Sequence, residues 1–252
     1  MNLSLDIGNT HIKFGLFEGR KLVRSGRLET SSEGVISPTK RKAWESLYNP
    51  LPEWLIYSSV RKHFEATQLH LPKGIKTVRL QTDTPLPVKN RYRTPETLGP
   101  DRLAAAVGAY AQFGGANCLI IDAGSCITLD LLIEGAFEGG SISPGLDMRL
   151  DAMHRFTDGL PRPAAKRLPG GETGDSIRLG KTTEEALLLG ALQGALLEIE
   201  GFIASAERQY GPLKVLLTGG DASFLADKLK REIFVLPNLV LRGLNEILLH
   251  NV

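Results

Sequence analysis

The sequence has few cysteines, few aromatic residues and no excess of charge of either sign. Two of its 252 residues are cysteine, Cys118 and Cys126, and aromatic residues make up 6%. Two cysteines outside any C-x-x-C pair exclude a disulfide framework and a zinc-type ligand spacing, and they suit a reducing compartment. Thirty Lys and Arg against 28 Asp and Glu leave a net charge of +2, which argues against a nucleic-acid partner and favours a small-molecule one.

Long apolar runs are also missing. The first residues run directly into a strand pattern, without the basic and apolar regions of a secretion signal. The most apolar stretch, residues 186–197, is interrupted by Gly190, Gln193 and Gly194, and it is shorter than the roughly 20 apolar residues that a membrane span needs. The sequence therefore predicts a cytoplasmic protein with no membrane partner.

The chain has the composition of a folded α/β protein. Hydrophobic residues make up 42% and charged residues 23%, which excludes a disordered chain and a coiled coil. Residues 81–98, with Pro85, Pro87 and Pro95, are expected to form a loop. Periodicity and capping residues predict strands at 3–7, 12–16, 21–28, 54–59, 75–80 and 214–217, and helices opened by Ser37-Pro38 and at 61–70, 100–113 and 183–208.

A segment in the middle of the chain repeats its beginning. Leu3-Ser4-Leu5-Asp6-Ile7-Gly8-Asn9-Thr10 matches Leu119-Ile120-Ile121-Asp122-Ala123-Gly124-Ser125-Cys126 at an offset of 116 residues. At the same offset Leu16-Phe17 falls on Leu132-Ile133, and Glu18-Gly19 falls on Glu134-Gly135. The recurrence of strand, Asp-x-Gly turn, strand and second turn predicts a duplication, with an N-terminal lobe of residues 1–114 and a C-terminal lobe of residues 115–252.

Each repeated hairpin can bind a phosphate. The Asp at the end of a buried strand lies beside the free amides of a glycine turn, which suits a phosphate and its magnesium ion, held through water. In the first hairpin Asn9 and Thr10 add donors, and Lys13 could neutralise phosphate charge. A purely structural turn is the alternative, because Asp-x-Gly is ordinary turn chemistry. Two such hairpins in one register favour phosphate binding.

A third motif, Gly99-Pro100-Asp101-Arg102, opens the Ala-rich helix. Asp101 could accept or orient the proton of an attacking hydroxyl. The planar fork of Arg102 suits a substrate carboxylate. The alternative for Asp101 is that it only stabilises the helix N-terminus, where negative charge is favoured.

Together these motifs resemble the type III pantothenate kinases, which belong to the superfamily of actin, sugar kinases and acetate kinase. The resemblance implies an α/β chain of two duplicated ribonuclease-H-like lobes with a nucleotide cleft between them, the actin-like ATPase fold. It implies transfer of the γ-phosphoryl of ATP to the primary hydroxyl of pantothenate, the first step towards coenzyme A. The matching segments are residues 6–10, 99–102, 122–125, 139–145, 183–186 and 218–222.

The resemblance also assigns site residues. It implies that Asp101 is the catalytic base and that Asp122 helps to hold a monovalent cation, potassium or ammonium. Magnesium is expected at Asp6, through water. Contacts with ATP are implied for Asp6, Ile7, Gly8, Asn9, Thr10, His11, Ile12, Lys13 and Ser125, and contacts with pantothenate for Tyr92, Gly99, Pro100, Asp101, Arg102 and Thr183.

Several of these residues have simpler explanations. Thr183 could be a helix N-cap, residues 139–145 a turn into the next helix, and Thr218-Gly219-Gly220 a strand-to-helix turn. The family usually has Thr-Ala where this chain has Ser125-Cys126, which keeps the hydroxyl, and Cys126 is expected to act as a small buried hydrophobe.

The resemblance implies a homodimer formed through the second lobe. The helix from Thr183 is apolar around more than one face, and Gly190 and Gly194 would let a second helix approach closely. The alternative is a helix buried wholly inside its own lobe.

Two other functions are compatible with this fold. One is a kinase for another small hydroxy acid, and the other is a non-catalytic regulator. The presence of Asp6, Asp101, Arg102 and Asp122 argues against the regulator, since a binding protein needs no catalytic base.

Overall fold

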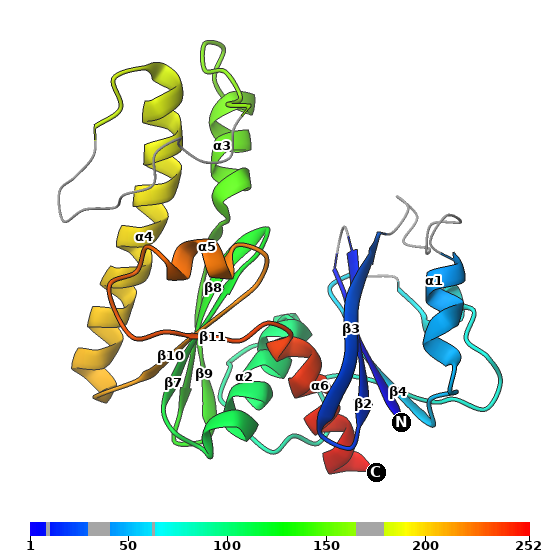
Figure 1. Cartoon of the computed structure of the whole chain (residues 1–252). Helices are drawn as coiled ribbons and strands as arrows, with labels where there is room; N and C mark the ends of the chain where they lie inside the picture. Colours follow the sequence, from blue (N-terminus) through cyan, green and yellow to red (C-terminus); the bar gives the residue numbers. More distant parts are fainter. Residues whose placement is uncertain (9–10, 30–40, 62–63, 165–178) are drawn as a thin grey trace. The chain divides into compact units, whose positions relative to one another are not determined.

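A computed structural model describes residues 1–8, 11–29, 41–61, 64–164 and 179–252 (Figure 1). The chain forms two compact units. Unit 1 consists of Met1–Ala116, Leu132–Gly139 and Asn238–Val252, and unit 2 of Asn117–Leu131 and Gly140–Pro237. These units differ from the predicted lobes in residues 115–116, 132–139 and 238–252, which belong to the unit that contains the first part of the chain. Spatial contacts do not show whether the two halves arose by duplication. The boundary between the lobes near Gly114 therefore stays a prediction.

Unit 1 contains a five-stranded sheet in the order β3-β2-β1-β4-β5. The first three strands form an antiparallel meander, whereas β4 and β5 run parallel to β1. All five predicted strands are confirmed within two residues at each end. They are β1 (Asn2–Ile7), β2 (His11–Glu18), β3 (Lys21–Glu29), β4 (Trp54–Ser59) and β5 (Lys76–Arg79).

Side chains of β1 alternate between the two faces of this sheet. Leu3, Leu5 and Ile7 are fully buried in a core with Trp44 of α1 (Arg41–Glu45). The opposite face packs on α6 (Leu239–Asn251), where Asn2 Nδ2 donates to Asn245 Oδ1 over 3.2 Å (Figure 1). Asp6 is four residues after Asn2 in the same strand, so both side chains point to the same face of the sheet. The Asp6 carboxylate therefore lies on the face that α6 covers.

The helix α2 (Pro100–Phe113) matches its predicted bounds and packs directly on α6. The contact depends on two glycines. A Cβ on Gly243 would lie 1.7 Å from the Ala104 carbonyl oxygen, and one on Gly108 would lie 2.7 Å from the Leu239 carbonyl oxygen. Backbone therefore meets backbone, and any larger side chain at either position would force the helices apart.

The second sheet has the order β11-β10-β7-β8-β9-β6. Without β6 and read in the opposite direction, as β9-β8-β7-β10-β11, this order repeats that of the first sheet strand by strand, which supports the duplication. The new elements are β6 (Lys89–Asn90), β7 (Cys118–Ala123), β8 (Cys126–Ile133), β9 (Ala136–Pro144), β10 (Lys214–Thr218) and β11 (Phe234–Val235).

The structure corrects the register of the repeat. β1 and β7 match at the predicted offset of 116, but β2 matches β8, and β3 matches β9, at an offset of 115. The first turn is one residue longer: the Gly8 N–H donates to the His11 carbonyl, whereas the Gly124 N–H donates to the Cys126 carbonyl. Lys13 therefore corresponds to Thr128. The pairing of Glu18-Gly19 with Glu134-Gly135, on which the single offset relied, was wrong.

Two further predictions were wrong. Residues 61–70 do not form one helix: the described part contains only a short 3-10 helix, η3 (Ala66–Leu69), which ends where His70 adopts a left-handed φ of 48°. Residues 139–144 continue strand β9 rather than forming a turn, and α3 (Leu146–Arg155) follows Gly145. The predicted helix start at Ser37-Pro38 lies outside the described residues. The expected loop contains β6 and a 3-10 turn, η4 (Pro95–Thr97).

In unit 2, α4 (Thr183–Tyr210) lies beside α3 (Figure 1). Leu150 of α3 packs on Leu187 and Leu188 of α4. Arg149 of α3 pairs with Glu198 of α4. Burial raises the pKa of Glu198, but hydrogen bonds to Ser143 and Arg149 outweigh it, so the pKa is lowered overall. A short helix, α5 (Ala222–Ala226), follows β10.

The helix α4 is not buried all around. Leu197 is 64% exposed, and a Cβ on Gly190 would meet open space. Within the described parts of the chain, α4 is also the one helix that is long and apolar enough to cross a membrane, with a mean hydropathy of 1.6 over its best window. The helix is longer than residues 186–197, the interrupted apolar stretch from which no membrane span was predicted. A core helix passes the same test, and nine α4 residues are buried: Leu187, Leu188, Leu189, Ala191, Ala195, Leu196, Ile199, Ile203 and Ala206.

Candidate active site

Asp6 lies at the end of β1 and is held by both neighbouring strands. Its Oδ1 accepts a hydrogen bond from Ser58 Oγ of β4 over 3.3 Å. Its Oδ2 lies 3.7 Å from Lys13 Nζ of β2. Asp6 is 8% exposed, whereas the Lys13 side chain is 45% exposed. The carboxylate is therefore fixed in place, and the ammonium beside it remains accessible to an anion.

The turn after Asp6 is held by an arginine that the sequence analysis missed. Arg61 Nε donates to the Gly8 carbonyl oxygen over 2.8 Å, and the Gly8 N–H donates to the His11 carbonyl over 3.0 Å. The predicted ATP-binding residues Asn9 and Thr10 lie outside the described residues. Ile7 and Ile12 are fully buried and pair across the hairpin, so their side chains belong to the core.

Asp122 occupies the equivalent position in the second sheet. Thr218 of β10 faces Asp122 in register, just as Ser58 of β4 faces Asp6. A hydroxyl residue opposite the strand-end Asp is thus repeated in both sheets. The Thr-Gly-Gly motif identified Thr218 in the sequence. Ser58 was not predicted, because no sequence pattern links it to Asp6.

Two glycines let neighbouring backbone approach the Asp122 turn. A Cβ on Gly219, whose φ is +97°, would lie 2.5 Å from Asp122 Oδ1, and a Cβ on Gly145 would lie 2.3 Å from the Gly124 carbonyl oxygen. The Gly145 N–H donates to the carbonyl of Ser125 over 3.0 Å, and Ser125 itself is exposed. The Gly-rich segments at 139–145 and 218–220 therefore each bring one glycine, Gly145 and Gly219, against this turn. Their place beside the active site stays a prediction.

The start of α2 presents Asp101 without a side-chain cap. Asp101 Oδ1 accepts a hydrogen bond from the Arg102 N–H over 2.9 Å. A Cβ on Gly99 would lie 2.5 Å from that same oxygen, so the carboxylate occupies space that only glycine leaves open. This bond agrees with the helix-terminus interpretation of Asp101, and it also fixes the carboxylate for a catalytic role.

Arg102 and Tyr92, both predicted to bind substrate, are brought together. The guanidinium carbon of Arg102 lies 5.7 Å from the centre of the Tyr92 ring and 5.8 Å from that of Phe137, which the sequence analysis did not single out. Arg102 is 7% exposed. Its charge is therefore largely removed from water, which strengthens its attraction for a carboxylate that reaches it.

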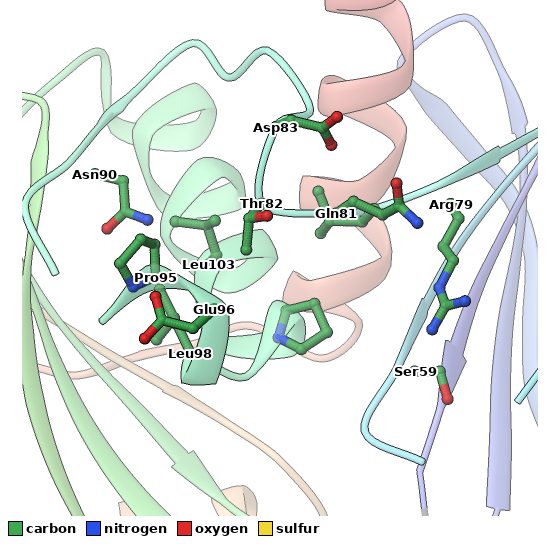
Figure 2. A pocket seen from close by; sticks show the side chains of 12 residues that line it. Ser59, Arg79, Gln81, Thr82, Asp83, Asn90, Pro95, Glu96, Leu98 and Leu103 are labelled. Atoms are coloured by element: carbon green, nitrogen blue, oxygen red, sulfur yellow. The ribbon is translucent and has the colours of Figure 1, made fainter. Parts of the chain in front are cut away.

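A pocket of about 550 Å³ lies next to the start of α2 (Figure 2). Ser59 and Arg79, at the ends of β4 and β5, line one side, and Leu98 and Leu103 line another. Pro100 also lines the pocket. The remaining lining residues are Leu80, Gln81, Thr82, Asp83, Asn90, Pro95 and Glu96. Pro100 is the predicted substrate residue among them. The wall is polar on the loop side, which suits a small polar molecule.

Thr183 is exposed and is the first residue of α4. The N-cap is instead Thr182, whose Oγ1 accepts from the Glu185 N–H over 3.2 Å, so the interpretation of Thr183 as the cap was wrong. Cys126 is half-buried rather than buried, whereas Cys118 is fully buried.

The oxygen donors fit a magnesium ion that is bound mainly by phosphate and water. Within the described parts of the chain, no group of three or more His, Cys, Asp or Glu side chains could hold a metal ion. Magnesium in phosphoryl-transfer sites commonly uses one or two carboxylates together with substrate phosphates, and Asp6 offers one such carboxylate. The role of Asp122 in holding a monovalent cation stays a prediction.

Solved structures of similar fold include a transcriptional activator and a sugar kinase, both described as putative. A putative Baf family transcriptional activator from Campylobacter jejuni has a TM-score of 0.62 and 22% identity, covering 99% of this chain and 98% of that one. A putative 2-dehydro-3-deoxygalactonokinase from Sinorhizobium meliloti has a TM-score of 0.57 and 16% identity, covering 98% of each chain. These similarities confirm the predicted actin-like ATPase and sugar kinase fold.

Sequence comparison is more specific. A protein named type III pantothenate kinase from Cytophaga hutchinsonii is 39% identical over 253 residues, covering 100% of both chains. One of the same name from Bacteroides fragilis is 42% identical over 258 residues, covering 100% of this chain and 98% of the relative. The family model for type III pantothenate kinase matches residues 2–205. This chain therefore belongs to the type III pantothenate kinase family.

Proposed function

We propose that this protein transfers the γ-phosphoryl group of ATP to the primary hydroxyl of pantothenate. The product is 4'-phosphopantothenate, and the reaction opens coenzyme A biosynthesis. The observation that carries the proposal is the family match over residues 2–205, in a chain that keeps both Asp101 and Arg102 at the start of α2. Since both substrates are cytoplasmic metabolites, we assign the enzyme to the cytoplasm.

Asp101 acts as the base in this proposal. The hydroxyl oxygen of pantothenate forms a bond to the γ-phosphorus, the bond from that phosphorus to the β–γ bridging oxygen breaks, and the electron pair leaves with ADP. The hydroxyl proton passes to the Asp101 carboxylate. The hydrogen bond from the Arg102 N–H to Oδ1 supports this role, because it holds the carboxylate in one orientation.

Arg102 binds the carboxylate of pantothenate, and Tyr92, Gly99, Pro100 and Thr183 contribute to the same site. Arg102 is nearly buried and lies against the Tyr92 ring. The guanidinium has two parallel N–H donors that can bind both oxygens of a carboxylate. A simple sugar has no carboxylate. This feature favours pantothenate, or another small hydroxy acid, over a sugar.

The turn after Asp6 binds the phosphates of ATP. Gly8, Asn9, Thr10 and His11 contribute to it, Lys13 offsets phosphate charge, and Ser125 contacts the nucleotide from its own turn. Magnesium, when bound at Asp6, neutralises phosphate charge. The ion pair of Asp6 with accessible Lys13 supports this assignment.

Asp122 holds the monovalent cation, potassium or ammonium, and the chain forms a homodimer through α4. Exposed Leu197 and the open space at Gly190 support a contact with another helix there. We expect a two-fold interface in which the small residue at position 190 allows the two helices to approach closely.

The test is ADP release by purified protein with ATP, magnesium and potassium, and with a panel of acceptors: pantothenate, other small hydroxy acids and sugars. Turnover restricted to pantothenate is the expected result. Turnover with another hydroxy acid alone would replace the substrate, and no turnover with any acceptor, together with retained nucleotide binding, would favour the non-catalytic regulator.

A further inference from the structure

We propose that Phe137 is a positioning residue for the substrate carboxylate: it holds the guanidinium of Arg102 against Tyr92 in the orientation that pantothenate requires. The inference rests on the proposed function, since it assumes that Arg102 binds the carboxylate. Phe137 is fully buried and contacts the binding residues rather than the substrate. All three residues belong to unit 1.

The three side chains form one cluster, the Arg102 cluster of Tyr92, Arg102 and Phe137. The guanidinium carbon lies 5.7 Å from one ring centre and 5.8 Å from the other. The two rings lie 6.1 Å apart with their planes tilted by 48°. Both distances from the cation are within the range of about 6 Å for cation–π attraction. Two differently inclined rings restrict a planar guanidinium more than one ring does.

Backbone pairing fixes the positions of both rings. β6 runs parallel to β9 with Asn90 opposite Phe137, and the Arg91 N–H donates to the Phe137 carbonyl over 3.0 Å. Arg91 Nη1 also donates to Glu138 Oε1 over 2.5 Å. These bonds place Tyr92, two residues after Asn90, beside the Phe137 ring. The short strand β6 within the long loop thereby positions Tyr92 in the cluster.

Gly139 closes the cluster on the Tyr92 side. Its φ is +106°, and a Cβ there would lie 3.3 Å from Tyr92 Cδ2. The absence of a side chain thus leaves room for the tyrosine ring. Two residues of β9, at positions 137 and 139, therefore determine where Tyr92 and Arg102 meet.

The expected consequence concerns affinity for the carboxylate. A guanidinium whose orientation is no longer restricted must be ordered each time the substrate binds. Desolvated cation–π contacts are strong enough that losing one of two should weaken pantothenate binding by about 10-fold. The chemical step does not involve Phe137, so kcat should change by less than about 2-fold.

The experiment compares Phe137→Leu with wild type, using pantothenate and pantothenyl alcohol, in which a hydroxymethyl group replaces the carboxylate. The KM for pantothenate should rise about 10-fold with kcat nearly unchanged, and the KM for the alcohol should stay within about 2-fold. Phe17→Leu is the matched control: Phe17 is also fully buried in unit 1 but lies at the far end of β2 from the Asp6 turn. It should leave both KM values unchanged.

A double-mutant cycle makes the test specific. In an Arg102→Gln background, Phe137→Leu should cause no further loss of kcat/KM for pantothenate, because the group that it positions is gone. If Phe137→Leu proves unstable in thermal unfolding, Phe137→Met, whose flexible side chain can fill an irregular space but which also removes the aromatic face, serves the same purpose.

The inference is overturned if Phe137→Leu and Phe137→Met leave the KM for pantothenate unchanged, if they raise both KM values equally, or if the effect persists in full without Arg102. Failure of the proposed function looks different: wild-type protein would then not phosphorylate pantothenate at all.

Discussion

Ser58 donates a hydrogen bond from its hydroxyl to Asp6 Oδ1 over 3.3 Å, and the two residues face each other across the parallel strands β1 and β4. Both are buried. Asp6 Oδ2 also pairs with Lys13 Nζ. Ser58 therefore orients the carboxylate that is proposed to hold magnesium.

Replacing Ser58 by Ala should raise the KM for magnesium-ATP about 5-fold, the factor that corresponds to one net hydrogen bond. Steady-state kinetics with varied ATP measures this. Ser4→Ala is the matched control, since Ser4 is equally buried in β1 but its hydroxyl has no hydrogen-bond partner in the described part of the structure. An equal effect of both variants would contradict the role of Ser58.

Replacing Asp101 by Asn should lower kcat by about 100-fold or more, because the proton acceptor is lost. Nucleotide binding should persist, since the Asp6 turn is untouched. ADP release and a nucleotide-binding titration measure the two effects. The amide can still accept the Arg102 N–H through its oxygen, so folding should be retained. Unchanged kcat would leave Asp101 only its stabilising role at the helix N-terminus.

Potassium or ammonium should raise the rate above that in sodium, because Asp122 is proposed to hold a monovalent cation. The measurement is the initial rate at constant ionic strength in each chloride salt. In Asp122→Asn the difference between the salts should disappear, while Asp227→Asn, a change at the end of α5, should preserve it. A wild-type rate that is equal in all three salts would remove the proposed cation.

Replacing Leu197 by Glu should convert the proposed homodimer to a monomer of about 27.4 kDa and lower activity in parallel. The folded monomer should lose little stability, because Leu197 is 64% exposed. Light scattering coupled to gel filtration measures the mass. Gln209→Glu adds the same charge at another exposed position of α4 and should leave the dimer intact. Fully active wild-type protein of monomer mass would contradict the proposal.

The two cysteines should react very differently with a thiol reagent. Burial raises the pKa of Cys118 to about 11, although Lys214 partly opposes the rise. Since Cys118 is also fully buried, alkylation at pH 8 should label Cys126 at least about 10-fold faster. Peptide mass spectrometry distinguishes the two sites.

The same pKa shift predicts the pH dependence of stability. The Cys118 thiol keeps its proton in the fold up to about pH 11, but an unfolded chain releases it near 9.0. The free energy of unfolding should therefore fall as the pH rises from 9 to 11. Cys118→Ala should lose less stability over this range in urea titrations. Equal slopes would show that the thiol is exposed to water.

Sequence patterns predicted the strands well because alternation and strand-end motifs are local. The approximate bounds predicted for β4 and α2 agree with those in the structure. The helix at 61–70 failed because its periodicity does not reveal that Glu65 and Gln68 cap a single short turn. The register of the repeat failed because a chance Glu-Gly match concealed an additional residue in the first turn.

The site was predicted where residues are adjacent in sequence, as in Asp101 and Arg102. It was missed where strands or loops bring distant residues together. Ser58, Arg61 and Phe137 carry no recognisable motif, and only the pairing of β4 with β1 and of β6 with β9 connects them to the predicted residues. The role of Thr183 in substrate binding stays a prediction.

The close packing of α6 on α2 has a consequence for how the protein is made. β1 to β5 and α2 leave the ribosome before most of unit 2, whereas residues 238–252, which complete unit 1, follow unit 2 in the chain. Until then the groove of α2 at Gly108 and the Asn2 side of the sheet lack their covering helix. Unit 1 can therefore be completed only after unit 2 has been synthesised, and we expect its nascent form to expose apolar surface during that time, as incompletely folded domains do.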